Sequence, residues 1–285
     1  MIPREVLDWL EAKGFGSPVD TQGVAGGCIN NGVRLKTTTG VRFFLKTNQH
    51  CPPDMFAKEV AGLKALTVPR APRVPKPFMH GAYFLLMEDL APASRTADYW
   101  ETFGEQMAAL HLNTHLQFGF EADNYIGSTP QPNPWTEDGF DFYAQHRFGF
   151  QADLAARQGL LTAREADEVR QLAGQLQELI PEQPASILHG DLWSGNATTD
   201  SNGDPAIIDP AAYYGWAEAD LAMMVLFGSP PARFFDAYQA VRPLANGWRD
   251  RFGLYNIYHL LNHLNLFGRS YHAQAMNSVR RFSRR

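Results

Sequence analysis

The residues best suited to chemistry lie in one short run late in the chain, His189 to Asn196, which reads HGDLWSGN. Asp191 precedes Asn196 by five positions, and Asp209 follows the amide by 13 positions. Kinase-type phosphoryl transfer needs a carboxylate that orients and deprotonates a hydroxyl, and an Asn and an Asp that hold Mg2+ against the ATP phosphates. We therefore predict Asp191 as the base and Asn196 and Asp209 as the Mg2+ ligands. The alternative is turn chemistry, with Asp191 as a cap and Asn196 in a left-handed conformation.

Three neighbouring residues have predicted supporting roles. We expect His189 to brace the loop through hydrogen bonds, and Asp220 to hold the backbone of the catalytic loop. Trp193 stacks on a substrate sugar if it is exposed, and anchors the core if it is not. Only 11 residues separate Asp209 from Asp220. A protein kinase needs a longer activation segment there, with an Ala-Pro-Glu element, so the spacing favours a small-molecule kinase.

A glycine-rich segment near the N-terminus precedes a predicted hairpin of strands over 33–37 and 41–46. Residues Gly26, Gly27 and Cys28 of this segment are predicted to contact the nucleotide. Simple turn chemistry is the alternative, because neither a Walker sequence nor G-x-G-x-x-G is present.

Two charged residues follow at positions that suit phosphate binding. Lys46 ends the second strand, and Glu59 lies 13 residues on, inside a predicted helix over 54–66. We predict that Glu59 pairs with Lys46 and fixes its ammonium group for the phosphates of ATP, since positioning is most of phosphoryl-transfer catalysis.

A short apolar strand over 83–87 is predicted to lead into a hinge that holds adenine through its backbone, at Met87, Glu88 and Leu90. An ordinary strand exit is the alternative.

The order of elements predicts an α+β, two-lobed protein-kinase-like fold. Residues 1–89 would form a small lobe with an antiparallel sheet and one helix, and residues 90–285 a larger, mainly helical lobe.

Further helices are predicted over 98–113, 154–179, 218–227, 231–241 and 248–267, with an aromatic loop over 118–150. His111 and His115 are interpreted as packing residues at a helix end, because no third ligand accompanies them. The basic cluster at 280–285 is interpreted as a solvated tail.

Bulk properties exclude several classes of protein. The chain has 285 residues, 45% of them hydrophobic, and a net charge of -5. These values indicate an ordered globular protein and argue against nucleic-acid binding. We expect a cytoplasmic protein without membrane contact, because no 18-residue apolar window and no secretory signal is present. Two cysteines, Cys28 and Cys51, form no disulfide framework.

The catalytic run resembles that of the fructosamine kinase (ketosamine 3-kinase) family, which shares the fold of aminoglycoside phosphotransferases and choline kinases. The likeness extends to the segments at 26–30, 44–46, 86–88, 123–127 and 255–263, and spans nearly the whole chain. It implies ATP- and Mg2+-dependent phosphorylation of the sugar 3-hydroxyl of ketosamines, either small molecules or glycated proteins, and thereby deglycation. Ribulosamines and erythrulosamines are expected to be better substrates than fructosamines.

The resemblance makes the aromatic loop the expected acceptor wall. Its candidate sugar contacts are Asp123, Asn124, Tyr125, Asn133 and Trp135. Cys28 is either a redox-sensitive thiol that can join two chains, giving a monomer or a redox-dependent homodimer, or an inert small residue. Two alternative functions stay open: another small-molecule kinase of this fold, acting on an aminoglycoside, choline or homoserine, and a nucleotide-binding pseudokinase regulator.

Overall fold

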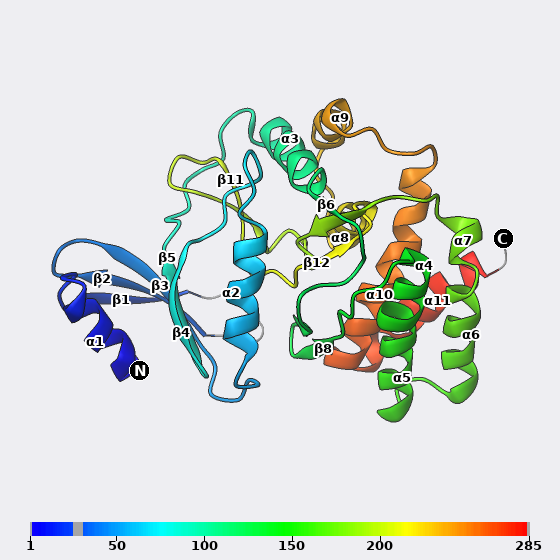
Figure 1. The fold of residues 1–285 in the computed structure, drawn as a ribbon, viewed down its shortest axis with the longest axis horizontal. Coiled ribbons are helices and arrows are strands. Elements are labelled where there is room, and N and C mark those ends of the chain that lie inside the picture. Colours follow the sequence, from blue (N-terminus) through cyan, green and yellow to red (C-terminus); the bar gives the residue numbers. More distant parts are fainter. Residues whose placement is uncertain (1, 25–30, 284–285) are drawn as a thin grey trace.

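The computed structural model describes residues 2–24 and 31–283, and the chain forms first a sheet with two helices and then a mainly helical part (Figure 1). The sheet has five strands, all paired antiparallel, in the order β1-β2-β3-β5-β4. The strands are β1 Pro18–Val24, β2 Asn31–Thr37, β3 Arg42–Thr47, β4 Pro77–Gly81 and β5 Phe84–Glu88.

Each face of the sheet is covered by one helix (Figure 1). Helix α1 (Arg4–Ala12) buries Val6 and Leu10 in the same cluster as Phe43 and Leu45 of β3. Helix α2 (Met55–Ala65) packs with Leu85 and Met87 of β5 on the other face. Because side chains alternate between the faces of a strand, Lys46 lies on the α2 side.

The C-terminal part is built mainly from helices. They are α3 Tyr99–His111, α4 Gly139–Tyr143, α5 Phe150–Arg157, α6 Ala163–Ala173, α7 Leu176–Leu179, α8 Glu218–Leu226, α9 Ala232–Val241, α10 Trp248–Phe267 and α11 His272–Phe282. Two single-turn helices of other types are η1 Ala144–Gly149, a π-helix, and η2 Arg269–Tyr271, a 3-10 helix. Helix α10 passes through the middle of this part (Figure 1). None of the helices in the described ranges is long and apolar enough to cross a membrane.

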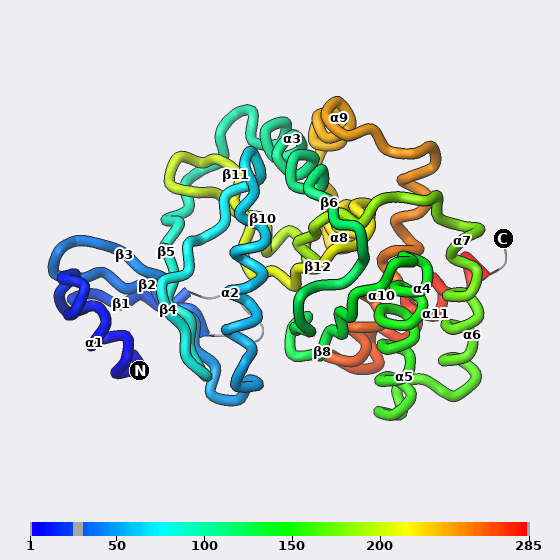
Figure 2. Tube along the Cα trace, in the orientation of Figure 1, coloured from blue at the N-terminus to red at the C-terminus, as the bar shows by residue number. Residues whose placement is uncertain are grey.

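Seven short strands accompany these helices. They are β6 Thr114–His115, β7 Asn124–Ile126, β8 Thr129–Gln131, β9 Ala185–Leu188, β10 Ala197–Thr199, β11 Pro205–Ile207 and β12 Tyr213–Gly215. The β10–β11 hairpin reaches the segment that precedes β4, where Ile207 N–H donates to the Arg73 carbonyl (2.8 Å) (Figure 2). This contact ties the segment 189–209, which we call the catalytic segment, to the sheet.

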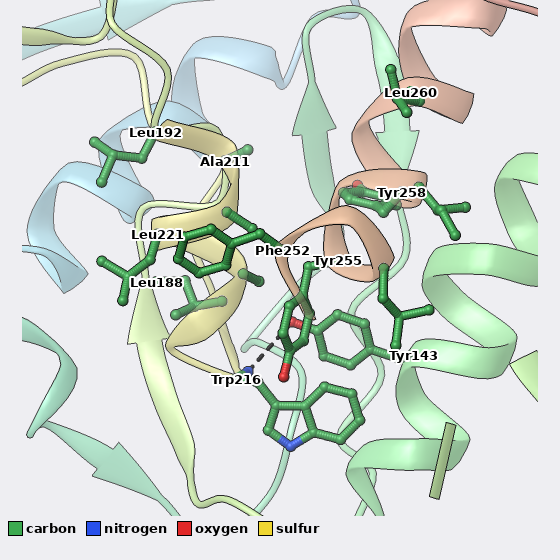
Figure 3. Close-up of a cluster of buried hydrophobic side chains, with 14 of the residues drawn as sticks. Tyr143, Leu188, Leu192, Ala211, Trp216, Leu221, Phe252, Tyr255, Tyr258 and Leu260 are labelled. Carbon is green, nitrogen blue, oxygen red and sulfur yellow. Dashed lines mark hydrogen bonds between the residues drawn. The ribbon is translucent and has the colours of Figure 1, made fainter. Parts of the chain in front are cut away.

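An aromatic and aliphatic core supports the catalytic segment from behind (Figure 3). Tyr143 and Trp216 stack with ring centroids 4.3 Å apart, and Tyr143 Oη accepts a hydrogen bond from Trp216 N–H (3.3 Å). Leu188 and Leu192 are fully buried on either side of the turn that carries Asp191. Asp191 is therefore held between two buried core residues.

Two predictions about the middle of the chain were wrong. The segment 118–150 is not a continuous loop, because it contains β7, β8, α4 and η1. Asp138 caps α4 by accepting hydrogen bonds from the N–H groups of Phe140 (2.6 Å) and Asp141 (3.2 Å). The predicted helix over 154–179 is broken, because Gly159 turns the chain at φ +69° and Thr162 starts a new helix with a capping box.

The basic cluster at the C-terminus begins on a helix. Arg280 and Arg281 are exposed, as expected of a solvated cluster, while Arg284 and Arg285 lie outside the described residues. Helix α11 itself buries Ala275, Met276, Val279 and Phe282, and Arg280 pairs with Glu168 (2.8 Å). These apolar residues recur at helical spacing, so the pattern was present in the sequence.

Candidate active site

A cavity of about 820 Å3 lies between the sheet and the helical part. The sheet side contributes Phe44, Lys46, Glu59, Met87, Glu88, Asp89 and Leu90. The helical side contributes Asn124, Tyr125, Asp191, Trp193, Asn196 and Asp209. The structure thus brings residues from most of the chain to one cavity.

The turn that follows β9 carries Asp191 into this cavity. Gly190 has φ +81°, and a Cβ at this position would lie 2.1 Å from the carbonyl oxygen of Ala211. Only glycine fits this close approach. The turn therefore requires the glycine of the HGD sequence.

Asp191 and Asn196 interact directly. Nδ2 of Asn196 donates to the Asp191 carbonyl (2.8 Å) and to its carboxylate Oδ2 (3.3 Å). Burial, followed by the charges of Asp209 and Asp220, raises the pKa of Asp191 to about 7, while the Asn196 hydrogen bond opposes the rise. A carboxylate with this pKa is suited to accepting a proton near neutral pH.

A buried ammonium group links the sheet to the catalytic segment. Lys46 Nζ lies 2.7 Å from Glu59 Oε1 and 2.9 Å from Asp209 Oδ1. The predicted contact between Lys46 and Glu59 is therefore present. Burial alone would lower the pKa of Lys46, but Asp209 and Glu59 together raise it above its ordinary value, so the ammonium stays charged.

Asp209 adopts a left-handed backbone conformation, with φ +58°, which is uncommon for a residue other than glycine. Hydrogen bonds on both sides hold it there: Ile208 N–H donates to the Asn196 carbonyl (3.0 Å), and Ala211 N–H donates to the His189 carbonyl (2.9 Å). This backbone geometry directs Asp209 toward Lys46.

The residue types around Asn196 and Asp209 fit Mg2+. The Asn196 amide nitrogen is occupied by Asp191, which leaves the amide oxygen as its acceptor, and the Asp209 side chain is 39% exposed. Within residues 2–24 and 31–283 no group of three or more His, Cys, Asp or Glu side chains could enclose a metal ion. Two oxygen ligands suffice for Mg2+, which usually takes its other ligands from phosphates and water.

The supporting contacts predicted for His189 and Asp220 are present. Asp220 accepts hydrogen bonds from the N–H groups of His189 (2.7 Å) and Gly190 (2.9 Å), and also contacts His111 Nε2 (3.2 Å). His189 Nε2 lies 2.8 Å from the Ile208 carbonyl. Burial lowers the pKa of His189, so the ring is neutral and Nε2 carries the proton. His111 is a buried partner of Asp220, as its packing role requires.

The predicted hinge residues Met87, Glu88 and Leu90 all line the cavity. The Glu88 carboxylate pairs with Arg73, whose other nitrogen binds Asp200 (2.9 Å). With its side chain engaged there, Glu88 can meet a nucleotide through its backbone.

The structure brings only some residues of the predicted acceptor wall to the cavity. Trp193, Asn124 and Tyr125 line the cavity. The half-buried Trp193 packs over Gly195, where a Cβ would lie 2.3 Å from the indole ring. Asn124 is tied to the chain by the Ala212 carbonyl (2.8 Å), and Tyr125 Oη donates to Asp54 (2.8 Å).

Three candidate contacts lie elsewhere. Trp135 stacks on His115 (4.3 Å), and the exposed Asp123 accepts a hydrogen bond from Asn133 N–H (2.7 Å), so neither lines the cavity. The buried Asn133 donates to Asn124 (2.9 Å) and supports the wall from behind. These interpretations were wrong because the loop folds back on itself and satisfies its own polar groups.

Sequence reasoning missed residues that line the far end of the cavity: Phe227, Asn262, His263, Leu266, Phe267 and Tyr271. Phe267, the last residue of α10, is 49% exposed. Asn262 and His263 gave no clear signal, because α10 also carries the polar residues Asn256, His259 and Asn265. Gly26, Gly27 and Cys28 lie outside the described residues, so their predicted roles stay predictions.

Comparison with known proteins places this cavity in a family context. The model of the family described as fructosamine kinase matches residues 7–285. A probable ketoamine kinase of Synechocystis is 42% identical over 269 residues, covering 92% of this chain and 89% of the relative. The chloroplastic protein-ribulosamine 3-kinase of Arabidopsis thaliana is 38% identical over 284 residues, covering 96% and 86%.

Solved structures agree on the fold. A candidate fructosamine-3-kinase of Thermobifida fusca has a TM-score of 0.90 and 31% identity, with 100% of both chains covered. The aminoglycoside phosphotransferase APH(4)-Ia has a TM-score of 0.60 and 16% identity, with 99% of both chains covered. The predicted α+β kinase-like fold is confirmed.

Proposed function

Because the chain belongs to the fructosamine kinase family, we propose that this phosphotransferase moves the γ-phosphoryl group of ATP to the sugar 3-hydroxyl of ketosamines. The observation that carries the proposal is the meeting of Asp191, Asn196, Asp209 and Lys46 in one cavity. Ribulosamines and erythrulosamines are the proposed preferred substrates. The small molecules or glycated proteins that carry them are the proposed partners.

In this proposal Asp191 binds and orients the acceptor hydroxyl. Its carboxylate takes the hydroxyl proton as the oxygen bonds to phosphorus, and ADP leaves. Asn196 holds Asp191 by the amide hydrogen bond (3.3 Å) and turns its own oxygen toward the metal position. The raised pKa, about 7, makes Asp191 a better proton acceptor than an exposed aspartate.

Lys46 is proposed to bind the phosphates of ATP, and Glu59 to keep its ammonium group in place (2.7 Å). Asn196 and Asp209 would hold Mg2+, which neutralises charge on the phosphates. The backbone of Met87, Glu88 and Leu90 would bind the adenine. We further propose that residues 1–89 and 90–285 work as two lobes around this cavity.

The product explains how such a kinase would remove a sugar from an amine. Phosphate on carbon 3 is a good leaving group next to the carbonyl at carbon 2. Enolisation takes a proton from carbon 1, phosphate leaves from carbon 3, and hydrolysis of the resulting imine frees the amine. Deglycation would therefore follow the enzymatic step without further catalysis.

A substrate panel tests the proposal. Wild type and Asp191→Asn would be supplied with ATP, Mg2+ and either ribulosyl-lysine, fructosyl-lysine, choline, homoserine or an aminoglycoside. We expect phosphorylated ribulosyl-lysine from wild type and at least about 100-fold less from the variant. ATP turnover that depends on choline, homoserine or an aminoglycoside alone would contradict the proposed substrate class. No turnover with any acceptor would favour the pseudokinase.

A further inference from the structure

One end of the cavity is aromatic and has no part in the proposed phosphoryl transfer. Its residues are Phe227, His263, Phe267 and Tyr271, which we call the aromatic shelf. The His263 ring contacts the other three, with centroids 4.9, 5.4 and 5.1 Å away. The shelf is therefore one continuous surface built from α8, α10 and η2.

The shelf keeps its rings accessible. Phe227 is 39% exposed and Phe267 is 49% exposed, although Phe227 directly follows α8 and Phe267 ends α10, two helices whose other apolar residues are mostly buried. Phenylalanine is normally a core residue, and accessible aromatic faces that line a cavity favour a ligand.

The shelf carries no charge of its own at neutral pH. His263 Nδ1 donates to the His259 carbonyl (2.7 Å), and burial lowers the pKa of the His263 ring, so it is neutral. The carboxylates that line the cavity, Glu59, Glu88, Asp89, Asp191 and Asp209, all come from other elements. The positively charged side chains that line the cavity, Arg34, Lys46 and Lys58, also come from other elements. A cation at the shelf would thus meet aromatic faces that carry no positive charge themselves.

The shelf shares its cavity with Asp191. Trp193 and Asn196, from the turn that carries Asp191, line this cavity together with Asn262 and His263 of α10. A group attached to a sugar at Asp191 would therefore lie in the cavity that the shelf lines.

We propose that the aromatic shelf binds the alkylammonium arm of the ketosamine through cation–π contacts and thereby separates ketosamines from free ketoses. This inference rests on the proposed function. In a ketosamine the amine lies on carbon 1, two carbons from the carbon that is phosphorylated, and it is protonated at neutral pH. A free ketose has a neutral hydroxyl at that position, and an N-acetylated ketosamine a neutral amide, so neither gains from aromatic faces.

The test compares three acceptors on four proteins. The acceptors are the ribulosamine of propylamine, its N-acetyl derivative and free ribulose. The proteins are wild type, Phe227→Leu, Phe267→Leu and the control Tyr83→Leu. Tyr83 is an aromatic residue in the turn between β4 and β5 that is 44% exposed and does not line the cavity. Leucine keeps apolar contact but has no π face, so the substitution isolates the cation–π contribution.

We expect kcat/KM for the ribulosamine to fall about three- to tenfold in each shelf variant. In the same variants, kcat/KM for ribulose and for the N-acetyl derivative should stay within about twofold of wild type. The control Tyr83→Leu should resemble wild type with all three acceptors. One outcome would overturn this inference but leave the proposed function standing. In that outcome the wild type phosphorylates the ribulosamine, and both shelf variants keep the wild-type preference for the ribulosamine over ribulose. Failure of wild type to phosphorylate any ketosamine would overturn the proposed function and the inference with it.

Discussion

Lys46 and Asp209 are 163 residues apart in the sequence, yet Lys46 Nζ lies 2.9 Å from Asp209 Oδ1. The contact joins β3 of the sheet to the catalytic segment. The proposed phosphate-binding cation thus neutralises the proposed metal ligand. Binding of ATP and Mg2+ would give each of them a further partner.

Substitutions of Lys46 and of its partner Glu59 should differ in their effect on folding. Lys46→Met would leave Glu59 buried without its partner, and we expect activity to fall about 100-fold or more and the free energy of unfolding to drop by about 3 kcal/mol. Glu59→Gln should keep the fold and lose about 10- to 100-fold in kcat/KM. Steady-state kinetics and thermal melts check both, and a Lys46→Met protein with wild-type kcat/KM would contradict the assigned role.

The pKa of Asp191 should appear in the pH profile. Protonated Asp191 cannot accept the hydroxyl proton, so kcat/KM should fall as pH decreases through about 7, the pKa in the free protein. The acidic limb of kcat reports the same group in the complex with ATP and Mg2+. A kcat/KM that is flat from pH 5 to 8 would contradict this account.

The same group should cost stability at high pH. The pKa of Asp191 is about 7 in the folded protein, while its ordinary value is 3.8, so between these pH values the folded state keeps a proton that the unfolded state has lost. Stability therefore falls as pH rises through this window. Asp191→Asn should raise the Tm relative to wild type more at pH 8 than at pH 5. Asp236 is exposed, and Asp236→Asn serves as the control. The change in Tm that it causes should be the same at pH 5 and at pH 8.

Asn196 should affect both the metal and the base. Asn196→Ala removes the hydrogen bond that opposes the raised pKa of Asp191, so the acidic limb of kcat/KM should move to higher pH. It also removes a proposed Mg2+ ligand, so half-maximal activity should need more Mg2+, by about tenfold. Mg2+ titrations at several pH values measure both effects. A variant that shows neither would place Asn196 outside the site.

The glycine at the catalytic turn should be irreplaceable. In Gly190→Ala the new Cβ would lie 2.1 Å from the Ala211 carbonyl oxygen, and we expect a loss of about 3 kcal/mol or more in stability together with misplacement of Asp191. Gly159→Ala is the matched control, because Gly159 also has positive φ (+69°) but open space around its Cβ position. That control should lose only about 1 kcal/mol. Equal losses in both would exclude the steric explanation.

The sequence was sufficient where the chemistry is local. Asp191, Asn196 and the turn at Gly190 lie within eight residues, and their spacing is set by one turn between β9 and β10. The pairing of Lys46 with Glu59 could also be predicted, because strand alternation and the helix that follows fix which face each side chain occupies.

Sequence reasoning failed where distant segments meet. Trp135 was chosen for the acceptor wall because it lies in an aromatic stretch, yet it stacks on His115 outside the cavity. The aromatic shelf was missed because Phe227 and Tyr271 reach the cavity only through the packing of α8 and η2 around α10. Periodicity shows that a face of α10 is buried, but not that its last turns open into a cavity.

The central claim is tested most directly by following ribulosyl-lysine, ATP and Mg2+ with wild-type protein by phosphorus and proton NMR. The account predicts a new phosphomonoester coupled to the proton on carbon 3 of the sugar, followed by its decay to inorganic phosphate and free lysine. A phosphate on any other hydroxyl, or ATP consumption without a ketosamine phosphate, would contradict it.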